Sequence, residues 1–93
     1  MVNVVVSIGN SDNKLSQQKW ASFVDDVDKI MLRLETRRHF FGGSHAWASW
    51  QNVCWLCEID PDSLYILRVS LRERCQVYNQ DAAFLLVGAG EFI

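Results

Sequence analysis

Residues 2–34 read VNVVVSIGNSDNKLSQQKWASFVDDVDKIMLRL and carry the clearest structural pattern in the chain. Valine and isoleucine alternate with other side chains over residues 2–8, which is typical of a β-strand with one buried face. Over residues 20–34 the apolar side chains are spaced three and four apart, which predicts an amphipathic helix. Ser16 is the expected N-cap of this helix, because its hydroxyl can accept a hydrogen bond from a free N–H of the first turn. The chain is therefore expected to begin with a strand followed by a helix.

The rest of the chain continues with strand and helix patterns. Aromatic and β-branched runs bounded by turn residues mark strands, and an apolar stripe at helical spacing marks a second helix. Asp60 supplies a capping carboxylate before that helix, and Pro61 is the proline at its first position. The elements predicted after the first helix are strands at residues 37–41, 49–59 and 82–87 and a helix that begins at Pro61 and carries its inner apolar stripe over residues 64–78.

The predicted order β-α-β-β-α-β is typical of the ferredoxin-like (split βαβ) α/β sandwich, in which a four-stranded antiparallel sheet carries two helices on one face. Right-handed crossovers give the spatial strand order 4-1-3-2. A length of 93 residues with 49% hydrophobic content suits a single domain over residues 1–93. This topology brings three connections to one end of the sheet: the one after the first strand, the central hairpin and the one before the last strand.

Charge and cysteine content exclude several classes of protein. Nine Lys and Arg against eleven Asp and Glu give a net charge of -2, so binding to nucleic acid is not expected. No apolar window approaches the roughly 18 residues of a membrane span, so no membrane association is expected. The three cysteines and the absence of a leader pattern indicate reduced thiols and a cytoplasmic location.

Polar and aromatic side chains concentrate in the three connections at the shared end of the sheet. Turn chemistry alone explains many Asn, Asp and Ser residues, but it does not explain two tryptophans in one hairpin. We therefore expect a surface for a partner protein or a small polar ligand there. Its candidate residues are Asn10, Ser11, Asp12, His45, Trp47, Trp50, Gln51, Asn52, Asn79 and Gln80.

The sequence offers no convincing catalytic, metal or cofactor site. Cys54 and Cys57 have the C-x-x-C spacing, but strand residues three apart point to opposite faces, so we interpret them as core thiols. His45, with an acidic residue and a serine from the neighbouring loops, is the best catalytic combination. It matches none of the hydrolase, metalloprotease or phosphate-loop motifs. The function favoured is therefore binding, and the alternative is a small-molecule or nucleotide-binding protein that could be catalytic.

The sheet face turned away from the helices is the second candidate surface. If Val2, Val4, Val6 and Ile8 of the first strand face the helices, the residues between them face outward, namely Asn3, Val5 and Ser7, together with one alternate set of residues from the third strand. Both possible sets contain a tryptophan. Because monomers seldom leave such an apolar patch open, we expect a homodimer, formed through this face or through the edge of the last strand.

Several short segments spread over nearly the whole chain resemble those of small proteins of actinobacteria and their phages, including mycobacteriophage accessory gene products. They are residues 7–12, 14–15, 50–52, 54–55, 78–81 and 91–93. The resemblance implies a protein that works in the host cytoplasm by binding and altering a host protein, or by sequestering a ligand.

Overall fold

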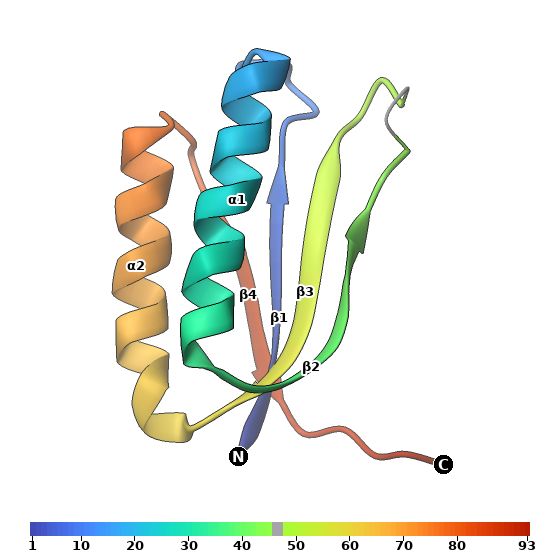
Figure 1. Cartoon of the computed structure of the whole chain (residues 1–93), viewed down its shortest axis with the longest axis vertical. Coiled ribbons are helices and arrows are strands. Elements are labelled where there is room, and N and C mark those ends of the chain that lie inside the picture. Colours follow the sequence, from blue (N-terminus) through green and yellow to red (C-terminus); the bar gives the residue numbers. More distant parts are fainter. Residues whose placement is uncertain (46–47) are drawn as a thin grey trace.

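A computed structural model describes residues 1–45 and 48–93 and confirms the ferredoxin-like order β-α-β-β-α-β (Figure 1). The elements are β1 (Val2–Gly9), α1 (Gln17–Leu34), β2 (Glu35–Gly43), β3 (Asn52–Ile59), α2 (Leu64–Val77) and β4 (Phe84–Gly88), with a short 3-10 turn η1 (Pro61–Ser63) before α2. Within the described residues, neither helix is long and apolar enough to cross a membrane.

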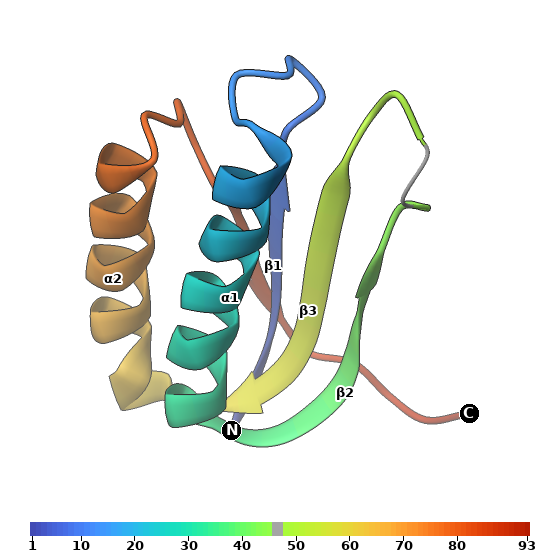
Figure 2. The same ribbon diagram turned by 45° about the horizontal axis from the view of Figure 1, so that its top comes forward.

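The four strands form one antiparallel sheet in the order β2-β3-β1-β4, which confirms the predicted topology. Both helices cover the same face, and the three connections lie together at one end of the sheet (Figures 1 and 2). β2 and β4 are therefore the two edge strands.

The core lies between the sheet and the helices. Val4 and Val6 of β1 and Trp55 and Cys57 of β3 are fully buried and face α1 and α2. The register of β1 and β3 places Val5 opposite Leu56 on the other face. This register resolves the question that the sequence left open, because it turns Trp55 inward and leaves Cys54, Leu56 and Glu58 on the uncovered face.

The ends of the helices follow the expected capping chemistry. The hydroxyl of Ser16 accepts a hydrogen bond from the N–H of Lys19 at the start of α1. The carboxylate of Asp60 accepts from the N–H of Asp62, although the turn that it caps is 3-10 rather than α-helical. These two caps confirm the predicted starts of both helical segments.

The strand boundaries differ from the pattern in the sequence. β2 begins at Glu35, directly after α1, two residues before the aromatic run that predicted it. β3 begins at Asn52 and β4 at Phe84, later than expected. The physical reason is that ladder pairing decides where a strand ends: β2 pairs with β3 along its whole length through two register shifts, which no local pattern encodes.

Candidate functional site

The polar end of the sheet is organised around Asn10. Its side chain is 1% exposed, and its backbone N–H donates to the carbonyl of Gln51 at 2.8 Å. The amide nitrogen donates to the carbonyl of Leu15 and to Oε1 of Gln51, while Oδ1 accepts from the N–H of Leu15. Asn10 therefore closes the β1–α1 loop and joins it to the start of β3.

Gln51 extends this contact to the first turn of α1. Its side chain and that of Gln17 exchange two hydrogen bonds of 3.0 and 2.8 Å. Gln17 was not among the predicted residues, because nothing in its own segment marks it. Together, Asn10, Gln17 and Gln51 form an amide cluster that ties three segments of the chain together.

The third connection is attached to the same loop more loosely. Nζ of Lys14 lies 3.5 Å from the carboxylate of Asp81 and 3.9 Å from that of Asp12, and all three groups are exposed. Asn79 has a φ of 54° and ends α2, with the N–H of Gln80 donating to the carbonyl of Cys75 in the manner of a Schellman motif. The conformation of Asn79 and Gln80 is thus explained by the end of α2.

The other candidate residues lie on exposed loops, except Asn52, which is the first residue of β3. Ser11, His45 and Asn52 are exposed, and Trp50 is 55% exposed in the hairpin. Trp47 lies outside the described residues. In Figure 1 the hairpin and the α2–β4 connection stand on opposite sides of the β1–α1 loop. The structure therefore joins Asn10 to Gln51 and brings Asp12 near Asp81, and a ligand site at this end stays a prediction.

The uncovered surface of the sheet, which we call the open face, carries several large apolar side chains that are exposed. The register of the ladders aligns side chains from all four strands on it. Phe40, Phe84 and Leu86 are each more than half exposed. The apolar part of the open face consists of Val5, Phe40, Leu56, Phe84 and Leu86, and the polar side chains of Asn3, Ser7 and Glu58 lie on the same side of the sheet. Sequence reasoning identified Val5 and the alternate residues of β3 but missed the two edge strands, whose register depends on pairing.

A hollow of about 360 Å³ lies on the open face beside the segment that follows β4. Val5 and Leu56 contribute to its lining, together with backbone and side chains of residues 88–92. The ring of Phe92 lies 5.5 Å from that of His39. The hollow is therefore an apolar depression continuous with the open face.

A charged cluster lies between α1 and the edge of the sheet. Nη2 of Arg38 is 2.8 Å from Oδ1 of Asp28, which also accepts a hydrogen bond from Nε1 of Trp55. Nε of Arg38 donates to Glu35, and the thiol of Cys57 donates to the same carboxylate oxygen at 3.1 Å. Burial, reinforced by the neighbouring Glu35, raises the pKa of Cys57 to about 12. A thiol with this pKa stays protonated at neutral pH and is a poor nucleophile, which speaks against a catalytic role for Cys57. The contacts of the cluster instead hold β2 and β3 against α1.

A metal-binding cluster would require cysteine, histidine or acidic side chains to lie close together. Among the described residues, no group of three or more His, Cys, Asp or Glu side chains could hold a metal ion. Cys54 and Cys57 point to opposite faces of the sheet, as their spacing in a strand predicts, and the three cysteines carry free thiols.

Comparison with known proteins adds no family to this description. A scan against protein-family models gave no match, and a search of curated proteins gave none. The resemblance to actinobacterial and phage proteins stays a prediction.

Proposed function

We propose that this protein acts by binding another protein, with the open face as its contact surface and without a chemical step. The observation that carries the proposal is the exposed apolar surface that runs across all four strands. Phe40 is 52%, Phe84 58% and Leu86 55% exposed. A contiguous surface of this kind is typical of protein interfaces, in which a few large side chains contribute most of the binding energy.

The chemistry of the polar end supports the same choice. The buried amide of Asn10 is satisfied by Leu15 and Gln51, and that of Gln51 by Asn10 and Gln17. These groups serve the loops themselves, so the open face is the better candidate for a partner. A second copy of the chain is one such partner, and the resemblance to phage accessory proteins implies a host protein as another.

Position-specific cross-linking tests the proposal. A photoreactive phenylalanine analogue is placed at Phe40 on the open face or, as a matched aromatic control, at Tyr65, which is 75% exposed on α2. After irradiation in cells, a discrete protein adduct is expected from position 40 and not from position 65. Mass spectrometry distinguishes an adduct of two copies from one with a different protein. Equal adducts from both positions, or none from position 40, would contradict the proposal.

A further inference from the structure

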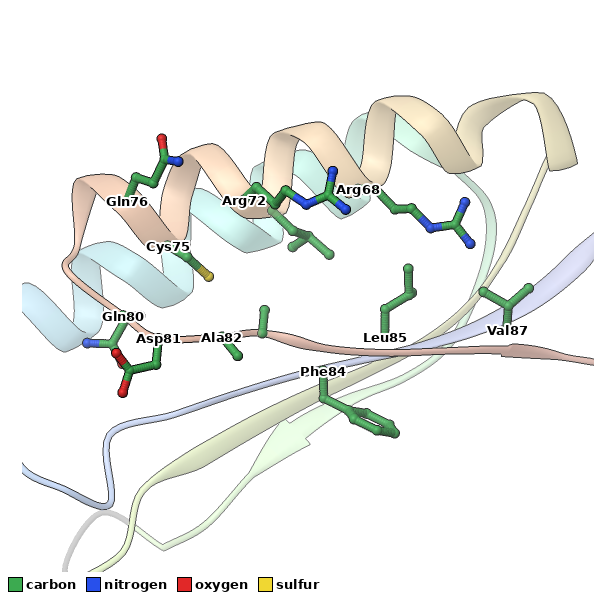
Figure 3. A pocket seen from close by; sticks show the side chains of 12 residues that line it. Arg68, Arg72, Cys75, Gln76, Gln80, Asp81, Ala82, Phe84, Leu85 and Val87 are labelled. Carbon is green, nitrogen blue, oxygen red and sulfur yellow. The ribbon is translucent and has the colours of Figure 1, made fainter.

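A groove runs between α2 and the edge strand β4, on the helix side of the sheet (Figure 3). It has a volume of about 640 Å³. Leu85 and Val87 point from β4 toward α2, while Cys75 points from α2 toward β4. Phe84 points away, onto the open face. The groove therefore opens on the helix side of the sheet, although Phe84 both lines it and belongs to the open face.

One wall of the groove is an unpaired strand edge. β4 pairs with β1 on one side and with no other strand of the described chain. In a strand of five residues, alternate residues direct their backbone N–H and C=O groups to the free edge, so about two or three residues of β4 can pair with an added strand. Such an edge is a template for an extended peptide.

The opposite wall carries two arginines. Arg68 and Arg72 line the groove and are exposed. Two acidic groups near α2, Asp26 and Glu73, pair with Arg74. Arg68 and Arg72 form no ion pair within the described part of the chain. The acidic side chain of the groove, Asp81, already lies beside Lys14. The groove is thus locally basic in a chain of net charge -2.

The spacing of the arginines matches that of a strand. Four residues of helix rise about 6 Å, and two residues of strand rise about 6.7 Å. α2 and β4 run roughly alongside each other (Figure 1). An added strand could therefore present acidic side chains at alternate positions to Arg68 and Arg72, while its other face would extend the apolar open face next to Phe84 and Leu86.

We propose that the α2–β4 groove binds an extended acidic segment of another protein, which pairs with the free edge of β4 and places two carboxylates, two residues apart, on Arg68 and Arg72. This inference does not depend on the role of the open face, because the contacts that carry it are backbone hydrogen bonds to β4 and ion pairs with Arg68 and Arg72.

The test uses a fluorescent peptide of sequence Ser-Val-Glu-Val-Glu-Val-Ser with blocked ends, titrated against the full chain by anisotropy. The double variant Arg68→Glu/Arg72→Glu is expected to bind the peptide at least about tenfold more weakly than the wild type, because two favourable ion pairs become repulsive. The matched control is Arg33→Glu/Arg37→Glu, which reverses two other exposed arginines and is expected to leave the affinity within about twofold. Far-UV circular dichroism verifies that both variants are folded.

Strand pairing is tested by methylating the peptide backbone. One peptide is N-methylated at its valines and another at its glutamates; since only alternate N–H groups of an added strand face β4, one of the two is expected to lose binding and the other to keep it. Protection of the β4 amides from hydrogen exchange is the accompanying readout. The proposal is overturned by undetectable binding at millimolar peptide, by equal weakening in both arginine variants, or by full binding of both methylated peptides.

Discussion

At the scale of single residues, Asn10 is the polar group on which the loop end depends most. Asparagine in a turn is usually exposed, but here its side chain is buried and forms three hydrogen bonds to Leu15 and Gln51. The groups that it satisfies would otherwise be left without a partner away from water, which costs more than the hydrogen bonds themselves contribute.

Asn10→Ala is therefore expected to lower the free energy of unfolding by about 2–3 kcal/mol, since it leaves the backbone groups of Leu15 unpaired. Urea denaturation measures the change. The control Ser11→Ala alters the exposed neighbouring residue and is expected to change the stability by no more than about 0.5 kcal/mol. Equal effects of the two substitutions would show that the amide cluster does not hold the loop.

Cys57 is the residue whose titration couples most clearly to folding. Its pKa rises from 9.0 to about 12 in the folded protein, so the unfolded chain loses the proton first as the pH increases. The unfolded state then binds fewer protons, and stability falls as the pH rises above about 9.

The free energy of unfolding is thus expected to fall by about 2 kcal/mol more in the wild type than in Cys57→Ala between pH 7.5 and 10.5. Urea midpoints at both pH values give this difference. Cys54→Ala, on the opposite face of the same strand, serves as the control and should retain the wild-type dependence. Parallel pH profiles for wild type and Cys57→Ala would refute the role of burial at this thiol.

At the scale of elements, the charged cluster explains how β2 is held although neither helix covers it well. Arg38 of β2 reaches Asp28 of α1, and Trp55 of β3 donates to the same carboxylate. The rings of Phe41 and Trp55 stack at 5.2 Å, and Arg38 lies over the ring of Phe41. One aspartate of α1 therefore connects the helix with two strands.

We expect Asp28→Ala to destabilise the protein by about 2–3 kcal/mol, because Arg38 and the indole N–H of Trp55 lose a partly buried partner. Asp25→Ala is the matched substitution on the same helix: Asp25 pairs with Lys29 in an exposed pair, and its loss should cost less than about 0.5 kcal/mol. Thermal or urea unfolding compares the two. A larger loss for Asp25→Ala would contradict the assignment of the cluster as the link between helix and sheet edge.

At the scale of the whole molecule, the two helices cover one face of the sheet and leave the other to solvent or to a partner. The interior face buries Val4, Val6, Trp55 and Ile59 completely, whereas the open face retains Phe40, Phe84 and Leu86 at the surface. The sheet is thus apolar on both sides, which favours association through the uncovered one.

Self-association through the open face predicts that sedimentation equilibrium detects a concentration-dependent dimer. Leu86→Lys is expected to shift it to monomer, with at least about tenfold weaker association, because a charge enters the apolar interface. Leu32→Lys introduces the same charge at a leucine that is 56% exposed on α1, compared with 55% for Leu86, and should leave association unchanged. If the wild type is monomeric at all concentrations, a second copy of the chain is excluded as the partner, and the partner of the open face is a different protein.

The order of elements, the capping of both helical segments and the inward face of β1 could be predicted from the sequence, because they follow from local spacing and from residues next to each other in the chain. Ser16, Asp60 and the valines of β1 carry that information locally. The predicted binding residues at the loop end could be placed only roughly, since a turn residue such as Asn10 looks the same whether it is exposed or buried.

Contacts between residues that lie far apart in the chain were decided by the tertiary structure alone. Gln17 meets Gln51 across 34 residues, and the cluster of Asp28, Arg38 and Trp55 joins three elements. The register of the edge strands, and with it the open face and the groove beside β4, likewise arises from pairing between strands. The sequence by itself determined which segments become helices and strands, because these patterns depend on neighbours in the chain. Only tertiary packing decided which apolar and basic side chains remain uncovered, because that depends on which surfaces the helices reach.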